Sequence, residues 1–227
     1  MNSFILDSIP FSVNLEILAQ MLHVEKGDAY DELAELLDKA RQIGKPKARY
    51  RTVFIESRGD DFVVIEGITF KSRVLQVNFE NIHRVFPFVA TCGAELHEWA
   101  YSLDDDLHRY WAEGIMGLAL LNAIGALDNH IKEQYGLKKI SHMAPGSLED
   151  WPIEEQVPLF KLLGDTKSAV GVELTDSFLM TPTKTVSGIR FPTEVDYENC
   201  MLCPQKDCPG RRAKYDKDMY DRKYRKK

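Results

Sequence analysis

The chain has 227 residues, 44% hydrophobic and 28% charged, with a formal net charge of −6. This composition is typical of a soluble globular protein that buries a core without disulfide staples. The longest apolar run, residues 115–127, is shorter than the roughly 20 residues of a membrane span, and the N-terminus lacks the basic region of a signal peptide. We therefore expect a cytoplasmic protein with reduced cysteines.

The N-terminal part predicts one helix followed by two strands. Apolar residues recur at helical spacing over residues 28–43, with Asp28 as the expected N-cap and Gly44 as the stop. Alternating apolar residues at 49–57 and 61–67 predict strands, which the turn "RGDD" joins.

The middle of the chain predicts a strand and two helices. The strand covers residues 84–92, and Gly93 after it opens a helix. A long helix is predicted from Asp104 to about Tyr135, and another over 151–164, where Trp151 is a packing anchor. Three glycines fall near one face of the long helix and predict close packing there: Gly114, Gly117 and Gly125.

The remaining pattern predicts two paired strands, residues 171–180 and 184–191, around the turn "TPTK". Helices and strands mixed with tight turns predict an α+β fold, with a twisted, largely antiparallel sheet and long flanking helices. We place the strands "VATCG" and "LTDSFLM" near the centre of the sheet. Residues 1–198 form the predicted domain, and residues 199–227 a cysteine-rich and basic tail.

The C-terminal tail is basic. Residues 211–227 carry nine Lys or Arg against three Asp, a local charge of +6, which leaves −12 on the rest of the chain. Such a run attracts nucleic acid or an acidic partner. Nucleic acid is disfavoured because no known nucleic-acid module accompanies it. A solvated, disordered end is the favoured interpretation.

Four short sequence motifs resemble those of one known family. They are "VATCGAEL" at 89–96, "APG" at 144–146, "LTDSFLMTP" at 174–182 and "TVSG" at 185–188. In this order they resemble the activation domain of cobalamin-dependent methionine synthase, and the similarity is clearest over residues 85–192. The resemblance implies a free-standing activation domain that carries an added cysteine cluster.

The resemblance implies a function in reductive activation. The family's domain binds S-adenosylmethionine and closes over cobalamin, so that oxidised cob(II)alamin is reduced and remethylated. A chain without room for the enzyme's other domains is expected to act on a separate corrinoid protein that carries the cobalamin. The implied activity is an accessory part of methionine synthase, a methyltransferase of methionine biosynthesis, with no catalytic residue assigned in this chain.

The resemblance also implies S-adenosylmethionine-binding residues: His142, Ala144, Gly146, Ser147 and Tyr197. His142 stands where the family has an Arg, and Ser147 where it has a Tyr. Arg grips a carboxylate permanently and in bidentate fashion, whereas His does not. These departures predict weak binding by the isolated chain. Asp128 is the candidate for an acidic contact from the long helix. Independently of the family, Gly146 is expected to make a turn.

The stretch "CMLCPQKDCPGRR", residues 200–212, has no counterpart in the family. Its C-x2-C-x4-C spacing brings three thiols within reach of one metal centre, and Cys-Pro steps follow cluster ligands in bacterial ferredoxins. Zinc accepts the same ligands. The remaining interpretation is that the three thiols bind no metal. The predicted ligands are Cys200, Cys203, Cys208 and, as the fourth, Cys92. An iron–sulfur (4Fe-4S) cluster is favoured because an electron carrier suits a corrinoid activator.

Two functional hypotheses follow. In the first, the chain is a redox or activation partner of a corrinoid methyltransferase, and a cluster in the tail hands over an electron. In the second, it is a non-catalytic module that binds a corrinoid protein and keeps a structural zinc tail. A direct part in methionine synthesis by split subunits is a third possibility. The membrane is not an expected partner.

Overall fold

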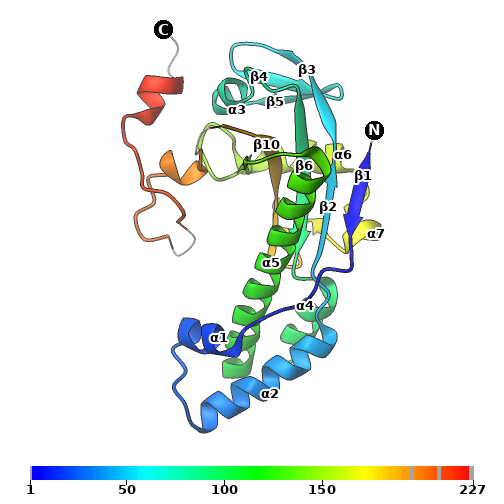
Figure 1. The fold of residues 1–227 in the computed structure, drawn as a ribbon, viewed down its shortest axis with the longest axis vertical. Coiled ribbons are helices and arrows are strands. Elements are labelled where there is room, and N and C mark those ends of the chain that lie inside the picture. The colour runs from blue at the N-terminus through cyan, green and yellow to red at the C-terminus, as the bar shows by residue number, and fades with distance from the viewer. Residues whose placement is uncertain (1, 195–196, 209–210, 225–227) are drawn as a thin grey trace.

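The computed structural model describes residues 2–194, 197–208 and 211–224. The molecule is curved, with the sheet and the C-terminal tail at one end, helices α1 and α2 at the other, and α5 running between them (Figure 1). The elements in chain order are β1 (Ser3–Leu6), α1 (Leu15–Leu22), α2 (Asp28–Ile43), β2 (Lys47–Arg51), β3 (Val53–Arg58), β4 (Phe62–Ile65), β5 (Ile68–Lys71), α3 (Arg73–Asn78), β6 (Arg84–Thr91), α4 (Ala94–Tyr101), α5 (Asp106–Tyr135), β7 (Ile140–Met143), the 3-10 turn η1 (Ile153–Glu155), α6 (Gln156–Leu163), α7 (Thr166–Val170), β8 (Glu173–Leu174), β9 (Met180–Thr181), β10 (Thr185–Pro192), the 3-10 turn η2 (Asn199–Met201) and the π-helical turn η3 (Tyr220–Tyr224).

The main sheet is antiparallel in every pairing, as predicted, and β6 is its central strand. The strand order is β1-β2-β6-β3-β4-β5, and β10 pairs with both β6 and β7. Strands β2 and β3 are the predicted strand 49–57, interrupted at Thr52. Seven of the eight β6 residues are buried, as expected for a strand covered on both faces.

Helix α5 joins two parts of the core. Its first half packs with α1, α2 and α4 through Trp111, Ile115 and Met116. Its second half packs on β1, β2 and β6 through Leu127 and Ile131. The helix begins after Asp105, whose carboxylate accepts a hydrogen bond from the His108 N–H, and ends at Gly136 in the left-handed conformation. Because α5 packs into both parts of the core, it connects the helical end of the molecule to the sheet end.

Several predicted elements are confirmed, with local corrections. The helix 28–43 is present, but its N-cap is Gly27, and Asp28 is its first residue. Trp151 is fully buried against Phe70, as expected of a packing anchor. The sequence pattern missed several short elements, which carry too few residues for a period to show: β1, α1, α3 and β7.

The prediction for "LTDSFLM" is wrong. Only Glu173–Leu174 and Met180–Thr181 form strands, and they pair with each other rather than with the main sheet. The residues between them form a tight turn, in which Leu179 is 63% exposed. The predicted partner strand, β10, pairs with β6 and β7 instead. The alternating apolar residues of this segment therefore do not mark a core strand.

The glycines of α5 meet two different surroundings. A Cβ at Gly114 would touch Met21 and Leu22 of α1, which is the predicted close packing, whereas Gly117 and Gly125 face open space. By length and composition alone α5 could cross a membrane. A core helix of a soluble protein passes the same test, and α5 packs into two core clusters. The cytoplasmic location stays a prediction.

The C-terminal tail, residues 197–208 and 211–224, folds back onto the sheet end of the molecule. Tyr224 is 1% exposed and donates a hydrogen bond to Asn78 of α3. Leu202 and Met219 pack against the same core cluster. The expectation of a disordered end is thus wrong for the described part, while the domain division at residue 198 stays a prediction.

Candidate ligand site on the concave face

A buried ion pair joins α5 to the edge of the sheet. The Arg190 Nε atom on β10 lies 2.9 Å from Asp128 Oδ1 on α5, and the Arg190 guanidinium stacks over the Phe88 ring at 4.7 Å. Burial raises the pKa of the Asp128 carboxyl above its ordinary value, although Arg190 acts in the opposite direction. Asp128, the acidic contact proposed from the sequence, therefore lies in a polar cluster.

His142 lies beside this pair because β7 pairs with β10. Arg190 and His142 are direct partners in the antiparallel register, so their side chains share one face of the sheet. Burial, together with the charges of Arg190 and Arg212, lowers the pKa of His142 to about 2. The imidazole is therefore neutral and offers a ring nitrogen as a hydrogen-bond acceptor.

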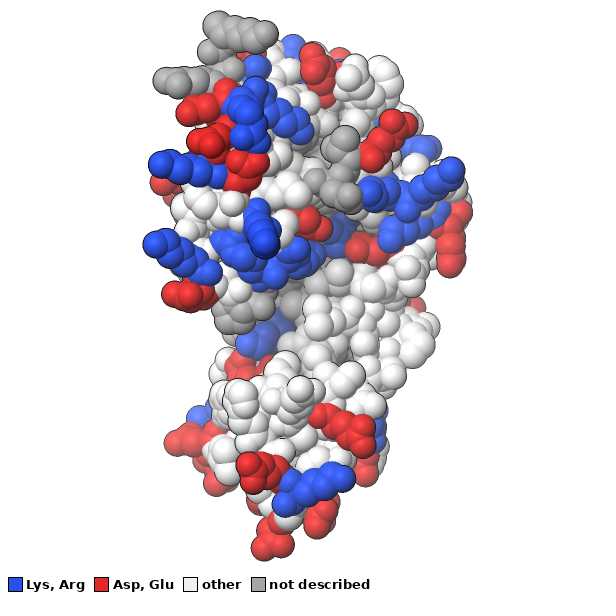
Figure 2. Space-filling view, turned by 60° about the vertical axis from the view of Figure 1, so that its left-hand side comes forward, with Lys and Arg blue, Asp and Glu red and all other residues white. Residues whose placement is uncertain are grey.

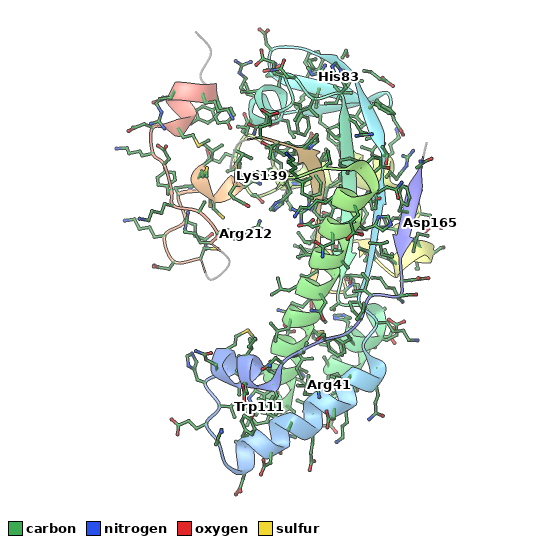
Figure 3. The ribbon with its side chains drawn as sticks, in the orientation of Figure 1. Arg41, His83, Trp111, Lys139, Asp165 and Arg212 are labelled. Carbon is green, nitrogen blue, oxygen red and sulfur yellow. The ribbon has the colours of Figure 1, made fainter. Side chains whose placement is uncertain are left out.

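Arg212 from the tail reaches this acceptor. Its guanidinium donates to His142 Nε2 at 2.8 Å and lies 3.5 Å from Glu198 Oε2. In Figure 3, Arg212 lies on the side of the tail that faces α5. We call Asp128, His142, Arg190, Glu198 and Arg212 the concave-face cluster. Helix α5, strands β7 and β10 and the tail all contribute residues to this cluster.

The buried charges of this cluster pair with one another. Arg190 Nε pairs with Asp128 Oδ1 at 2.9 Å, and Glu198 Oε2 lies 3.5 Å from the Arg212 guanidinium. Two carboxylates and two guanidiniums therefore meet in one cluster, and the Arg212 side chain is half-exposed. Such a cluster can bind a polar ligand that carries both charges.

The loop after His142 leads to a cavity. Gly146 has φ +80° and donates its N–H to the Trp151 carbonyl at 2.8 Å, so it makes the expected turn. A cavity of ≈ 440 Å³ opens between residues 146–150 and the tail, where Tyr215 and Tyr220 supply aromatic rings. Of the predicted site residues, Gly146 and Ser147 line this cavity.

Tyr197, another predicted ligand-binding residue, is buried in the core. It is 2% exposed, its hydroxyl donates to Asn199, and its carbonyl accepts from Ser141. Its ring packs on Phe191. Tyr197 therefore anchors the start of the tail beside β7, one residue before Glu198.

The three tail cysteines lie in one folded loop, residues 200–208, which we call the cysteine loop. The Arg211 guanidinium donates to the carbonyls of Cys200 at 2.9 Å and Cys203 at 3.1 Å, and also to that of Gln205. The three thiols are reduced and partly exposed. One arginine thus holds the backbone of the loop from inside.

Cys92, the predicted fourth ligand, lies elsewhere. It is fully buried in the cluster formed by α1, α2, α4 and the first half of α5, while the tail packs at the sheet end. Burial raises its pKa to about 12, which disfavours the thiolate form that a metal ligand needs. Within residues 2–194, 197–208 and 211–224, no three His, Cys, Asp or Glu side chains are gathered as a metal site.

The sequence did not predict the arginines of this site. Arg190 sits in the apolar strand "SGIRF", and only its pairing with β7 and its contact with α5 reveal its role. Arg212 was one basic residue among many in the tail. A larger cavity, ≈ 1050 Å³, lies near the end of α5 around His83 and Lys139, and none of the predicted site residues lines it.

The surface beside the cluster is largely uncharged. Figure 2 shows Lys and Arg side chains gathered across the upper part of the concave side, and a white surface between them and the acidic helical end. Along α5, steps of three and four residues put Gly117, Leu121 and Gly125 on the same helix face as Asp128, and Leu121 is 59% exposed.

Comparison with known proteins finds a similar fold. No protein-family model matches the chain, and no curated protein does. A solved structure described as the MetH reactivation domain bound to AdoHcy matches with a TM-score of 0.58 and 16% sequence identity, over 88% of this chain and 81% of that chain. The α+β fold with its antiparallel sheet is therefore that of the MetH reactivation domain.

Proposed function

We propose that this chain binds S-adenosylmethionine in the concave-face cluster and reactivates a separate corrinoid methyltransferase, such as methionine synthase. The fold supports the proposal, because the similar reactivation domain binds AdoHcy. The observation that carries it is the buried cluster of opposite charges on Asp128, Arg190 and Glu198, which the half-exposed Arg212 completes. Such a cluster suits a ligand with both positive and negative groups.

The amino-acid end of S-adenosylmethionine has the matching charges. Its carboxylate suits the Arg212 guanidinium, which is half-exposed and held in place by His142. Its ammonium group suits the carboxylates of Asp128 and Glu198. The tail thereby supplies the guanidinium that the 142–147 loop lacks, so binding is stronger than His142 alone predicts.

The adenosine end suits the neighbouring cavity. Its volume of ≈ 440 Å³ lies within the usual range for small-molecule sites. His142 and Gly146 are four residues apart, at most about 14 Å along an extended chain. Tyr215 and Tyr220 offer flat apolar faces to a purine. One nucleoside–amino acid ligand is therefore proposed to span the cluster and the cavity.

The partner in this proposal is a corrinoid protein that docks on the uncharged surface of α5. Gly117 and Gly125 have open space above their Cα atoms, so a partner can approach the helix backbone closely.

In the reaction, one electron reduces cob(II)alamin to cob(I)alamin. The reduced cobalt then takes the methyl group of the sulfonium, which leaves S-adenosylhomocysteine. A low-potential electron-transfer protein is the ultimate electron source.

The cysteine loop is proposed to hold a metal centre, with Cys200, Cys203 and Cys208 as ligands. A 4Fe-4S cluster would supply one-electron transfer there. Because Cys92 lies in another part of the core, the fourth position of such a centre is open or filled from outside. A structural zinc ion is the alternative, in a module that binds the corrinoid protein without passing electrons. Arg211 anchors the backbone of the loop, which favours a structural role for the loop over electron transfer.

Two experiments test the proposal. Anaerobically purified protein is analysed for iron, sulfide and zinc, and its visible spectrum is compared with that of Cys203→Ser. Separately, a cob(II)alamin-loaded corrinoid protein, a low-potential electron donor and methyl-labelled S-adenosylmethionine are mixed with the chain. We expect label on the corrinoid protein only when the chain is present, and far less with Asp128→Ala. No transfer above the chain-free control contradicts the activating function.

A further inference from the structure

Helix α3 contacts both sides of the cavity that the adenosine end is proposed to fill. The loop 146–150 forms one side, and tail residues that include Tyr215 and Tyr220 form the other. Val74 of α3 lines the same cavity. The last turn of the tail, η3, packs beside α3 at the sheet end of the molecule (Figure 1). The helix is therefore placed to set how far apart the two sides lie.

Asp150 ties the loop to the start of α3. Its carboxylate accepts hydrogen bonds from the N–H groups of Val74 at 2.9 Å and Arg73 at 3.3 Å, and from the Ser72 hydroxyl. The first N–H groups of a helix have no partner inside the helix, and a negative charge beside them is favourable. The loop side of the cavity therefore has a fixed attachment to α3.

Tyr224 ties η3 to the same helix. The Arg73 Nε atom donates to the Tyr224 carbonyl at 3.1 Å, and the Tyr224 hydroxyl donates to Asn78 at 3.0 Å. The turn η3 carries Tyr220 at its other end, and the Tyr220 ring lines the cavity. Burial, together with the charge of Asp150, raises the pKa of Tyr220, which agrees with a tail side that faces the loop.

Arg73 contacts both sides of the cavity. Its backbone N–H binds the loop through Asp150, and its side chain binds the tail through Tyr224. The guanidinium is itself fixed, because it also donates to the Asp60 carbonyl at 2.7 Å and to Gln76 Oε1 at 2.6 Å. Among the described residues, those that line the cavity do not include Arg73. Any effect of Arg73 on a ligand is therefore indirect.

We propose that Arg73 is a positioning residue, which holds the loop and η3 at the separation that a purine nucleoside fills. Without its guanidinium, η3 moves more freely and the cavity is correctly shaped for only part of the time. The apparent dissociation constant then rises by the reciprocal of that fraction. The nucleoside rests on the proposed function, whereas the attachment of both sides to Arg73 does not.

Four variants separate this role from the others. Arg73→Gln removes the guanidinium contacts and keeps the backbone N–H. Asp150→Asn weakens the attachment of the loop and serves as a second variant if Arg73→Gln does not fold. Arg212→Gln changes only the concave-face cluster. Arg222→Gln is the matched control, because it removes a guanidinium from the same turn, where Arg222 pairs with Asp216 on the surface.

The test combines hydrogen exchange of the ligand-free full chain with calorimetry. Hydrogen exchange is measured for residues 146–150 and 220–224, with strand β6 as the internal reference for global stability. Calorimetry measures the affinity for adenosine and, separately, for S-adenosylmethionine. Adenosine probes the cavity alone, because it lacks the amino-acid end that the concave-face cluster is proposed to bind.

We expect Arg73→Gln to raise exchange at residues 220–224 and Asp150→Asn to raise it at residues 146–150, with β6 unchanged in both variants. Both variants should weaken adenosine and S-adenosylmethionine binding by the same factor, at least about fivefold, which corresponds to a cavity that is correctly shaped for about a fifth of the time. Arg212→Gln should weaken S-adenosylmethionine binding alone, and Arg222→Gln should weaken neither.

The proposal is overturned if Arg73→Gln leaves exchange at residues 220–224 unchanged, if exchange in β6 rises equally, or if adenosine affinity keeps its wild-type value. If Arg73→Gln does not fold, the same criteria apply to Asp150→Asn at residues 146–150. If the wild type binds neither ligand but exchange rises only in these two segments, the proposed function fails, while Arg73 remains the support of both sides of the cavity.

Discussion

The two sides of the concave-face cluster are built differently. Asp128, His142 and Arg190 belong to a wall in which α5 and paired strands fix every backbone atom. Glu198 and Arg212 belong to a tail that packs on the core through Leu202, Met219 and Tyr224, and the Arg212 side chain is half-exposed. The buried residues of the wall therefore contribute to global folding, whereas Arg212 reaches the cluster from the surface. Changes in the wall should therefore cost stability, and changes in the tail should cost binding.

The largest expected effect is at the buried pair in the wall. Arg190→Met leaves the Asp128 carboxylate buried without its cation, and breaking such a pair typically costs about 3–5 kcal/mol. Chemical denaturation of the wild type and the variant measures this difference. The control is Arg222→Met, which removes an exposed pair with Asp216 and should change stability little. Equal losses in both variants would remove the distinction between wall and tail.

Two glycines should respond to alanine with changes of opposite sign. Gly146 has φ +80°, and a Cβ there would lie 2.7 Å from Ile153 Cδ1, so Gly146→Ala should lose about 1–3 kcal/mol of stability. Gly117→Ala should gain about 0.5–1 kcal/mol, because that helical position is open. Thermal unfolding of both variants checks the opposite signs. A stabilised Gly146→Ala would contradict the described turn.

The pH dependence of stability tests the buried His142. Its pKa is about 2 in the folded chain and about 6.5 when unfolded, so the unfolded chain takes up a proton first. Stability should therefore fall as the pH drops below about 6.5, by up to about 1.4 kcal/mol per pH unit from this group. Denaturation curves from pH 7 to 5 should show a shallower slope in His142→Gln. Parallel curves would mean that His142 titrates normally.

The smallest expected effect concerns the end of the tail. Tyr224→Phe removes the hydroxyl that donates to Asn78 and keeps the buried ring, so it should cost about 0.5–1.5 kcal/mol. Hydrogen exchange of the amides near residue 220 should rise, while that of β6 stays unchanged. Faster exchange in β6 would show that the tail and the wall unfold together.

The sequence predicted the wall better than the tail site. The helix 28–43 and the strand 84–92 have long, regular patterns of apolar residues. Both elements are present in the structure because burial of these apolar residues determines the element type. The segment "LTDSFLM" shows that alternating apolar residues can mislead, because it forms a turn in which Leu179 is exposed to solvent. A family resemblance placed His142 and Asp128 near a ligand, and both lie in the concave-face cluster.

Arg190 and Arg212 could not be predicted, because their roles depend on long-range contacts. Arg190 becomes part of the site only because β7 pairs with β10, about fifty residues away in the chain. Arg212 does so because the cysteine loop folds back on the core, which composition argues against. The spacing of Cys200, Cys203 and Cys208 predicted a common loop, but no spacing rule could tell that Cys92 lies in another cluster.

The most direct test of the account is the calorimetric affinity of the full chain for S-adenosylmethionine and S-adenosylhomocysteine, compared between the wild type, Arg212→Gln and Arg222→Gln. A lost charged hydrogen bond costs about 1.5–3 kcal/mol. We predict measurable binding in the wild type, unchanged binding in Arg222→Gln, and affinity about 10- to 150-fold weaker in Arg212→Gln. No binding in the wild type, or equal affinity in all three proteins, would contradict the claim that the wall and the tail form one ligand site.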